Sequence, residues 1–338
     1  MTLTERINAF AKLGDLINQG GPELDEAVLQ AYYQNRWFTT DNGYHMVKAV
    51  GLHYLSKEKL TQWLAPYQDR IEQHQPKTIG LTLAGNVPLV GFHDVLSVLI
   101  TGNKAQIKLS SKDKALMLFM LNNLFAIEPR FKAQVEVVEM LKGFDAVIAT
   151  GGNNTSRYFE YYFGKYPNII RKNRSSVAVL TGKETKAELV LLGYDVFQYY
   201  GLGCRNVSKL YVPMDYEFAP LFDALEPFAK TMDQDKYKNN YDYNRTLLLM
   251  NNTKHLSNDF IMLREHEDVA SPVSTLHYQY YKNLEEVALD IRLKRAQIQC
   301  VVGRAEVGAQ MIPFGQAQQP ELWDYADEVN TLEWHIKL

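Results

Sequence analysis

Apolar residues recur at helical spacing through the first 75 residues of the chain. Two runs show this spacing most clearly: Ile7, Phe10, Leu13 and Ile17, then Leu55, Leu60 and Leu64. Side chains three or four positions apart lie on one face of a helix, where they can pack against a core. We therefore predict that residues 1–75 are helical.

From Thr78 the pattern changes to short β-rich runs that alternate with helical stretches. The predicted strands are residues 78–83, 105–109, 135–138, 146–149 and 176–180, with helices at 89–100 and 113–125. This alternation predicts a parallel sheet with helices on both faces. The uninterrupted apolar runs AVIA and SVAVL agree with it, because a doubly covered strand buries both of its faces.

A second α/β segment begins near residue 182, and 338 residues are enough for two cores of ~150 residues each. Its predicted elements are a helix that ends at Tyr200, a glycine-rich turn at 201–204, and strands at 209–212, 246–250, 273–278 and 297–302. We place the domain boundaries at 181/182 and at 311/312. The tail, residues 312–338, is predicted to pack either on the first domain or on a partner chain.

The composition is that of an ordinary globular protein. Hydrophobic residues make up 46% of the chain and charged residues 22%, and the formal net charge is −3. The densest basic stretch spans residues 165–174, which we predict to be a solvated loop. Because the sequence has no concentrated basic stripe, it argues against a nucleic-acid or anionic-membrane surface.

Cysteine usage and the amino-terminal segment indicate a soluble protein of a reducing compartment. The two cysteines make no disulfide framework, and no C-x-x-C spacing suggests a metal site. The first residues carry charges and lack the apolar core of a signal peptide. The longest apolar tract, 87–100, is interrupted by His93 and Asp94 and is shorter than the ~20 residues that span a bilayer. We expect a cytoplasmic protein with no transmembrane segment and no metal.

Cys204 is the candidate nucleophile. It lies in GLGCRN, residues 201–206, directly after a predicted helix. Glycines at 201 and 203 remove side-chain bulk beside the sulfur, so that a substrate carbonyl could reach a thiolate, which Arg205 could favour. The alternative is a small buried hydrophobe, the usual environment of a free cysteine. Cys300 lies in an apparent strand without neighbouring glycines, and we predict that it belongs to the core.

Three further segments follow predicted strands and could bind a ligand at the carboxyl edge of the first sheet. Asn86, in LAGNVP, could donate a hydrogen bond to an oxyanion. Lys108, in IKLSS, could reach a ribose or a phosphate. Thr150, Gly151 and Gly152 precede a helix whose first N–H groups favour a pyrophosphate. Each segment could also be an ordinary turn, and the G-x-G-x-x-G fingerprint is absent from the sequence.

Taken together and in this order, these segments resemble the aldehyde dehydrogenase superfamily. They look most like its acyl-CoA reductase branch, which includes the fatty-acid reductase of bacterial luminescence. The segments that carry the resemblance are LAGNVP, GNKAQIKLSS, VIATGGNNTSRYF, YYGLGCRNVSKLYVP and IPFGQAQQPELWDYADEVNTL. The resemblance implies two parallel-sheet α/β domains with a helical amino-terminal region. Residues 1–181, with a Rossmann-like sheet at 78–181, would bind the nicotinamide cofactor, and residues 182–311 would form the catalytic domain.

The resemblance also implies a role for each candidate residue. Cys204 matches the catalytic thiol. Asn86 matches the oxyanion-hole carboxamide, with the backbone N–H of Cys204 as the second donor. Lys108 matches the lysine that contacts the adenosine ribose, and residues 150–152 match the stretch that packs against the pyrophosphate. Asp268, placed by its spacing from Pro272, falls where the superfamily usually has a glutamate that holds the nicotinamide ribose.

Departures from the superfamily pattern indicate an acylating enzyme. Aldehyde-oxidising members have a glutamate that activates water, whereas Ile170 occupies that position here and residues 166–182 contain no acid. Without that base, hydrolysis of an acyl-enzyme should be slow, so that a thiol or a hydride must discharge it. Members that select NAD often carry an acid shortly after the cofactor lysine. Ser111 stands there and would tolerate a 2′-phosphate, which favours NADPH and leaves NADH as the alternative.

The sequence therefore predicts an acyl-CoA reductase. The thiolate of Cys204 would attack an acyl-CoA or another acyl thioester, and NADPH would reduce the S-acyl enzyme to an aldehyde. An aldehyde dehydrogenase that oxidises free aldehydes is the second hypothesis. A non-catalytic acyl-binding partner of an acyl-activating enzyme is the third. The chain lacks an obvious counterpart of the early oligomerisation strand of the superfamily, so a homo-oligomer stays open.

Overall fold

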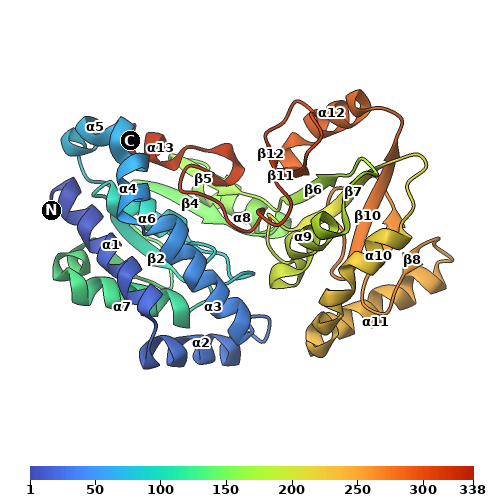
Figure 1. Ribbon diagram of the computed structural model, residues 1–338. Coiled ribbons are helices and arrows are strands. Elements are labelled where there is room, and N and C mark those ends of the chain that lie inside the picture. The colour runs from blue at the N-terminus through green and yellow to red at the C-terminus, as the bar shows by residue number, and fades with distance from the viewer. The chain divides into compact units, whose positions relative to one another are not determined.

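The chain divides into two compact units, each built on its own sheet (Figure 1). The computed structural model describes residues 1–338, apart from the side chain of Asn153. Unit 1 contains Met1–Asn173 and Pro320–Leu338, and unit 2 contains Arg174–Gln319. The predicted α/β class with a helical amino-terminal region is confirmed.

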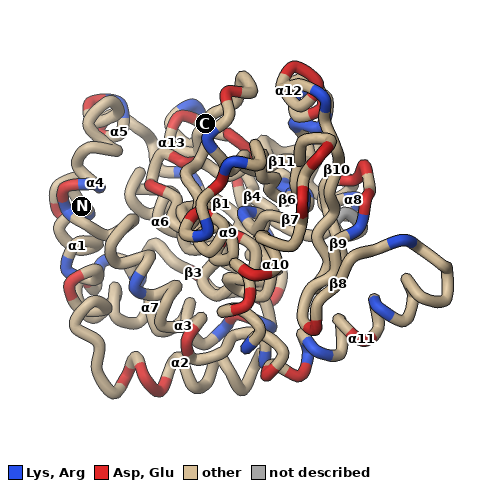
Figure 2. Tube along the Cα trace, turned by 45° about the vertical axis from the view of Figure 1, so that its right-hand side comes forward, with Lys and Arg blue, Asp and Glu red and all other residues tan. Residues whose placement is uncertain are grey.

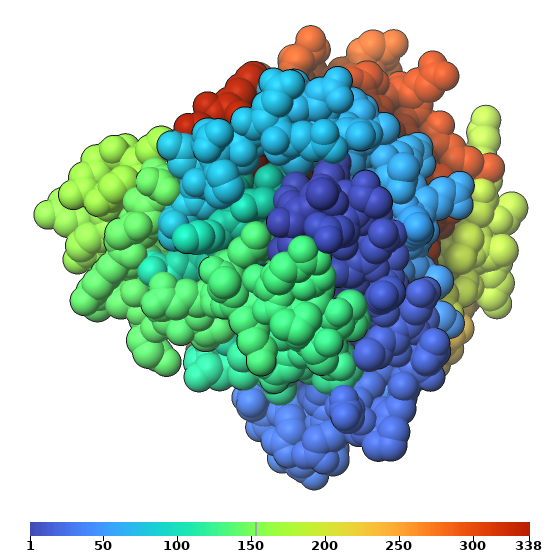
Figure 3. Space-filling view, turned by 90° about the vertical axis from the view of Figure 1, so that its left-hand side faces the viewer, coloured from blue at the N-terminus to red at the C-terminus, as the bar shows by residue number. Residues whose placement is uncertain are grey.

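Helices form the amino-terminal part of unit 1, as the apolar spacing predicts. They are α1 (Leu3–Gln19), α2 (Pro22–Gln34), α3 (Thr40–Ala49), α4 (Lys57–Leu64) and α5 (Gln68–Gln73), with a π turn at Val50–Tyr54 and a 3-10 turn at Ala65–Tyr67. Thr2 and Glu5 make a capping box that satisfies free N–H groups at the start of α1. Helix α1 packs against α7 (Ala115–Ile127), and Figure 3 shows α1 in dark blue beside α7 in green. The helical region thereby joins the core of the sheet that follows it.

Five parallel strands make the sheet of unit 1, in the order β3-β2-β1-β4-β5. The strands are β1 (Thr78–Thr82), β2 (Lys104–Lys108), β3 (Val135–Val137), β4 (Ala146–Thr150) and β5 (Asn168–Arg171). Helices α6 (Phe92–Ile100), α7 and α8 (Asn153–Phe163) lie between them in the chain, with a 3-10 turn at Pro129–Gln134. The three middle strands each bury at least three successive residues, because both faces of the sheet are covered.

The carboxyl-terminal segment Pro320–Leu338 belongs to unit 1, whereas residues 312–319 of the predicted tail belong to unit 2, so the boundary predicted at 311/312 falls too early in the chain. It contains a 3-10 turn at Ala326–Glu328 and helix α13 (Thr331–Ile336), which packs against α6. Leu322 and Leu332 are buried in the same core as the amino-terminal helices. The segment therefore completes the core of unit 1.

Seven strands make the sheet of unit 2, in the order β12-β11-β6-β7-β10-β9-β8. They are β6 (Ser175–Val179), β7 (Val207–Pro213), β8 (Leu256–Ser257), β9 (Met262–Glu265), β10 (Thr275–Tyr281), β11 (Ile298–Gly303) and β12 (Met311–Ile312). Neighbouring strands pair in parallel except β8 with β9, which is antiparallel, so this sheet is mixed.

The helices of unit 2 are α9 (Lys186–Phe197), α10 (Ala219–Leu225), α11 (Asp235–Met250) and α12 (Leu284–Leu293), with 3-10 turns at Gln198–Gly201, Glu226–Asp233 and Arg295–Gln297. Acidic and basic residues lie side by side along much of the trace, and Figure 2 shows both signs on α12. There Glu285 and Glu286 lie in the first turn and Arg292 in the last turn, an order that complements the helix dipole.

The domain boundary predicted at 181/182 is wrong. The strand predicted at 176–180 is β6, which pairs with β7 and β11, so the units divide between Asn173 and Arg174. A strand buried on both faces has the same apolar pattern in either sheet, so the pattern did not show which sheet it joins. Cofactor binding by the first unit and catalysis by the second stay predictions.

Two further element predictions are wrong. Residues 246–250, predicted as a strand, form the end of α11, because a short apolar run does not distinguish a strand from a helix. Residues 165–174, predicted as a solvated loop, contain β5, in which Arg171 is buried and paired with Asp94.

Among the described helices, none is both long and apolar enough to cross a membrane. The described side chains include no group of three or more His, Cys, Asp or Glu arranged to hold a metal ion. The cytoplasmic location stays a prediction.

Candidate active site

The carboxyl ends of β1, β2 and β4 meet at one edge of the five-stranded sheet. Thr82 at the end of β1 is in register with Lys108 of β2 and with Ala149 of β4. From β1 the chain first builds outward through β2 and β3, and then through β4 and β5 on the other side. Such a switch in direction is where open α/β sheets bind ligands. The predicted positions from Asn86 to Gly152 all follow these strands.

The loop after β1 carries Asn86 and packs against the loop after β2. Asn86 is exposed, whereas its neighbour Gly85 is buried. A Cβ at Gly85 would lie 2.2 Å from Ser110 Oγ, so glycine allows the two loops to touch. A second link is the N–H of Leu89, which donates to Asp113 Oδ2 at 2.8 Å. Both contacts hold Asn86 close to the end of β2.

Asp113 is a buried carboxyl within this link. Burial raises the pKa of Asp113 to about 7, although the hydrogen bond from Leu89 opposes the rise. The predicted cofactor residues Lys108, the last residue of β2, and Ser111, on the same loop as Asp113, are exposed. Both are therefore accessible to a ligand at this edge, as their predicted roles require.

Thr150, Gly151 and Gly152 make the turn from β4 into α8. Thr150 is the last residue of β4, and Gly152 is the N-cap of α8. A Cβ at Gly151 would lie 2.9 Å from the ring of Phe159 and 3.2 Å from Thr155 Cβ. Glycine therefore lets the chain enter α8 directly, and the first turn of α8 follows the sheet edge that carries Lys108. An N-terminus in this place favours an anionic group.

A buried ion pair connects α6 to the end of β5. The guanidinium of Arg171 donates to the carboxylate of Asp94, and the two residues are 7% and 3% exposed. Two charges are removed from water here, which is tolerated because they neutralise each other. Arg171 is also in register with Thr150, so the pair lies beside the turn that begins α8.

In unit 2, Cys204 lies in a tight turn that precedes β7. The turn closes twice: the N–H of Asn206 donates to Gly203 O at 3.1 Å, and the N–H of Gly203 donates to Asn206 Oδ1 at 2.8 Å. Ser176 Oγ of β6 donates to Cys204 O at 3.0 Å. The main chain around Cys204 is therefore fixed while the residue is partly exposed, which disfavours a fully buried hydrophobe.

Asn206 also connects this turn to the end of α9. Its carboxamide is buried, with 2% of the residue exposed. Nδ2 donates to Gln198 O at 2.9 Å, to Asp195 O at 3.0 Å and to Val196 O at 3.3 Å. Carbonyls at a helix end lack partners within the helix, and this side chain supplies hydrogen bonds to them.

Between α9 and the cysteine turn, three successive residues adopt left-handed backbone angles. The φ values of Tyr199, Tyr200 and Gly201 are 53°, 58° and 74°. For a residue with a side chain this conformation costs on the order of 1–2 kcal/mol. Strain of this kind persists only where the surrounding structure enforces it, and it is concentrated at functional sites.

Arg205, beside the nucleophile candidate, binds the segment that follows β12. Its Nε donates to Ala317 O at 2.5 Å. Asp195 of α9 holds the same segment, since its carboxylate accepts from Gly315 N at 2.6 Å and from Ala317 N at 2.9 Å. Burial raises the pKa of Asp195 to about 6, although both N–H groups and Arg205 lower it. An effect of Arg205 on the Cys204 thiolate stays a prediction.

Asp268 lies on the loop between β9 and β10, and side chains hold the main chain of this loop. Lys209 Nζ donates to Glu267 O at 2.6 Å, and Ser208 Oγ donates to Val269 O at 2.7 Å. His277 Nδ1 lies 3.0 Å from Asp268 O. The Asp268 side chain is 70% exposed. Because Ser208 is near the start of β7, Asp268 and Cys204 lie at the same edge of this sheet.

Cys300 is a core residue, as predicted. It lies in β11, is 8% exposed, and its Sγ lies 3.0 Å from Ser176 Oγ. The two cysteines therefore differ in access: one is enclosed in a strand and the other is partly open in a turn.

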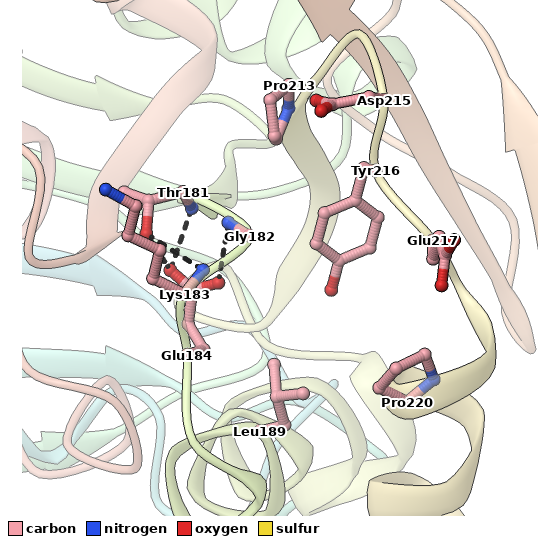
Figure 4. Close-up of a pocket in the computed structure, with 10 residues that line it drawn as sticks. All are labelled: Thr181, Gly182, Lys183, Glu184, Leu189, Pro213, Asp215, Tyr216, Glu217 and Pro220. Carbon is pink, nitrogen blue, oxygen red and sulfur yellow. Dashed lines mark hydrogen bonds between the residues drawn. The ribbon is translucent and has the colours of Figure 1, made fainter.

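A pocket of about 390 Å³ in unit 2 lies at the opposite end of β7 (Figure 4). Its lining residues are Thr181, Gly182, Lys183, Glu184, Leu189, Pro213, Asp215, Tyr216, Glu217 and Pro220. Figure 4 shows the Glu184 carboxylate bonded to the 181–182 turn, with the Tyr216 ring across the opening. Seven residues of strand at ~3.3 Å each separate this pocket from the Cys204 turn. The predicted nucleophile does not belong to it.

The structure thus groups the predicted residues in two sets. Asn86, Lys108, Ser111 and the 150–152 turn share the carboxyl edge in unit 1, and Cys204 and Asp268 share one edge in unit 2. Sequence reasoning missed Asn206, Asp195 and Asp113. Each is a buried polar residue beside a predicted motif, and that proximity was the only signal. Their partners are known only after folding.

The two α/β units have the fold of the aldehyde dehydrogenases, as predicted. Aldehyde dehydrogenase 21 of Physcomitrella patens, solved with succinate, superposes with a TM-score of 0.71 at 10% identity, over 100% of this chain and 84% of that one. The NADP-dependent glyceraldehyde-3-phosphate dehydrogenase of Bacillus halodurans C-125, solved with NADP, superposes with a TM-score of 0.63 at 13% identity. That match covers 93% of this chain and 78% of that one. An NADP-dependent enzyme of E. coli superposes with a TM-score of 0.68 at 10% identity, and the match covers 93% of this chain and 78% of that one.

The family described as acyl-CoA reductase (LuxC) matches residues 30–212, more than half of the chain, and the chain belongs to this family. One curated relative is the long-chain acyl-protein thioester reductase of Aliivibrio fischeri, which is 24% identical over 192 residues. That match covers 52% of this chain and 39% of the relative, so the chain spans about two fifths of the length of the relative.

Proposed function

We propose that this protein is an acyl reductase that holds an acyl group on Cys204 and reduces it to an aldehyde with NADPH. The observation that carries the proposal is the cysteine turn of unit 2. In a chain of the acyl-CoA reductase family, it presents a partly exposed thiol on a main chain fixed by Asn206 and Ser176.

In the first step, the thiolate of Cys204 attacks the carbonyl of an acyl thioester. A new C–S bond forms, and the bond to the donor sulfur breaks, releasing the donor thiol. Asn86 donates a hydrogen bond to the oxyanion during the attack, as its match to the family pattern implies.

The edge of unit 1 fits a nicotinamide dinucleotide. Gly151 lets the chain turn closely from β4 into α8, the first turn of α8 follows it, and Lys108 and Ser111 are accessible. When bound, the dinucleotide supplies the hydride that reduces the thioester carbonyl. Lys108 would then hold its adenosine ribose, residues 150–152 its pyrophosphate and Asp268 its nicotinamide ribose. Ser111 leaves space for a 2′-phosphate, which favours NADPH over NADH.

Reduction leaves a thiohemiacetal on Cys204, which collapses to an aldehyde and the free thiolate. Ile170 lies in β5. By its spacing from SSVAVL it matches the position at which aldehyde-oxidising members of the superfamily have the water-activating glutamate. An acyl-enzyme without that base resists hydrolysis and survives long enough to be reduced. This departure favours a reductase over an enzyme that oxidises free aldehydes to acids.

The test is to incubate the protein with acyl-CoAs of different chain length, weigh the intact protein and map any adduct. We expect an acyl group on Cys204, and aldehyde after NADPH is added. Cys204→Ala should give neither product. Cys300→Ala removes the buried cysteine and serves as the matched control, because it should still be acylated. Aldehyde formation by Cys204→Ala at the wild-type rate would refute the mechanism.

The same assay distinguishes the other hypotheses. Conversion of a free aldehyde to an acid would identify an aldehyde dehydrogenase. Acyl binding without an adduct would identify a non-catalytic partner. Acylation that needs an added acyl-activating enzyme, instead of acyl-CoA, would identify that enzyme as the donor.

A further inference from the structure

The main chain before Cys204 is strained and must be held in place. Tyr199, Tyr200 and Gly201 are all left-handed, and two of them carry large side chains. The N–H of Leu202 donates to Tyr199 O at 3.2 Å, and Tyr199 is buried. These contacts lie within the strained segment itself, and the cysteine turn that follows is held by Asn206, further along the chain.

The carboxamide of Asn206 makes contacts on both sides of this strained segment. Its Oδ1 accepts from Gly203 N–H, next to the cysteine, and its Nδ2 donates to carbonyls at residues 195, 196 and 198. The role needs an acceptor and donors on one short side chain, which asparagine provides. An aspartate would place a negative oxygen against three carbonyls, and an alanine would remove all four of these hydrogen bonds.

We propose that Asn206 is a positioning residue for the Cys204 nucleophile: its carboxamide holds the end of α9 and the cysteine turn in the geometry that acyl transfer requires. The inference rests on the proposed function of Cys204. Asn206 is 2% exposed and acts through the main chain, without touching the substrate. Its loss lets the left-handed segment relax and moves the sulfur, and a displacement of about 1 Å can lower a rate ~100-fold.

Two variants and one matched control test this role. Asn206→Ala removes the carboxamide, and Asn206→Asp keeps the acceptor but replaces the donor. Asn168 is the control: in unit 1 its Nδ2 donates to Phe163 O at 3.4 Å and to Tyr166 O at 2.8 Å, where it joins the region after α8 to the start of β5. Asn168→Ala therefore removes a similar bond far along the chain from Cys204.

For each protein we would measure the single-turnover rate of Cys204 acylation, the dissociation constant of NADPH and the melting temperature. Asn206→Ala should acylate ~10- to 100-fold more slowly than wild type while NADPH binds unchanged. Asn168→Ala should lower the melting temperature without slowing acylation. A purely structural role of Asn206 would weaken acylation and NADPH binding together.

Asn206→Asp adds a signature that decides the question even if Asn206→Ala does not fold. Protonation lets the introduced carboxyl donate one hydrogen bond to a carbonyl, so its acylation rate relative to wild type should rise as the pH falls. A folded Asn206 variant that acylates at the wild-type rate at every pH would overturn the inference while leaving the role of Cys204 intact. Acylation of Cys204→Ala would instead overturn the proposed function.

Discussion

At the scale of single residues, the two cysteines show how main-chain geometry decides the chemistry open to a side chain. Ser176 touches both, since its hydroxyl donates to Cys204 O and lies 3.0 Å from Cys300 Sγ. Cys300 is enclosed because it continues a strand, whereas Cys204 precedes one and sits in a turn. In the turn, the Cys204 residue is partly exposed to solvent, whereas in the strand Cys300 is buried.

Asn86 should contribute to the acylation step. Asn86→Ala removes one donor to the oxyanion, and loss of one such donor lowers a rate ~100-fold or more. We expect this loss in the rate of adduct formation on Cys204, measured by mass in single turnover. Asn123→Ala, which removes a carboxamide bonded to Phe119 O within α7, is the control and should acylate normally. Near-normal acylation by Asn86→Ala would remove this residue from the site.

Ser111 should influence the choice between NADPH and NADH. Ser111→Asp places a carboxylate where we expect the 2′-phosphate, so like charges repel while the NADH ribose gains an acceptor. The ratio of kcat/KM for NADPH to that for NADH should fall by about tenfold or more, which corresponds to ~1.4 kcal/mol. Ser111→Asn has a similar shape without the charge and should change the ratio far less. Equal ratios for the Asp variant and wild type would contradict the assignment.

At the scale of elements, helix α6 depends on a partner that its own sequence does not reveal. Asp94 in its first turn is buried and pairs with Arg171 at the end of β5. Local pattern suggested a solvated basic stretch around Arg171, because charge usually marks the surface. The paired acid, distant in sequence, makes the burial of Arg171 in β5 tolerable.

Breaking this buried pair should destabilise unit 1 strongly. Asp94→Ala leaves Arg171 buried without its counter-charge, a change that typically costs ~3–5 kcal/mol of unfolding free energy. Urea unfolding followed by circular dichroism measures the loss. Glu333→Ala, which breaks more exposed pairs with Arg70 and Lys337, is the control and should have a much smaller effect. Similar losses for the two variants would show that burial of the pair is unimportant.

At the scale of the whole molecule, buried titratable groups of unit 1 give opposing pH dependences. Burial lowers the pKa of His335 from its ordinary 6.5 to about 3. The fold therefore favours the neutral imidazole, and the stability from His335 is present above pH 6.5 and lost as the pH falls toward 3. Asp113 acts in the other direction: its pKa is raised from 3.8 to about 7, so its contribution is present below pH 3.8 and lost as the pH rises through 7.

Variants should separate these two contributions. As the pH rises from 3 to 6.5, the unfolding free energy of wild type should increase relative to that of His335→Gln by up to ~1.4 kcal/mol per pH unit. As the pH rises from 3.8 to 7, the unfolding free energy of wild type should decrease relative to that of Asp113→Asn. Urea unfolding across this pH range measures both differences. A constant difference between wild type and His335→Gln would mean that the histidine titrates alike in the folded and unfolded chain.

The sequence by itself determined the local features of this protein. The helical first 75 residues, most strands, the α/β class and a cysteine preceded by two nearby glycines could be read from it, because periodicity and glycine content act over a few neighbouring positions. It also marked the loops of Asn86, Lys108 and Gly151, since parallel strands bring their carboxyl ends to one edge.

Only the tertiary structure decided which sheet β6 joins, which acid neutralises Arg171 and which carbonyls Asn206 binds. An apolar strand pattern indicates that both faces of the strand are covered, but it does not indicate which helices or strands cover them. A charged or polar residue is tolerated inside only when a partner meets it, and those partners come from distant parts of the chain. Local pattern therefore predicted the elements and the candidate nucleophile, whereas the contacts that hold that nucleophile in place emerged only from folding.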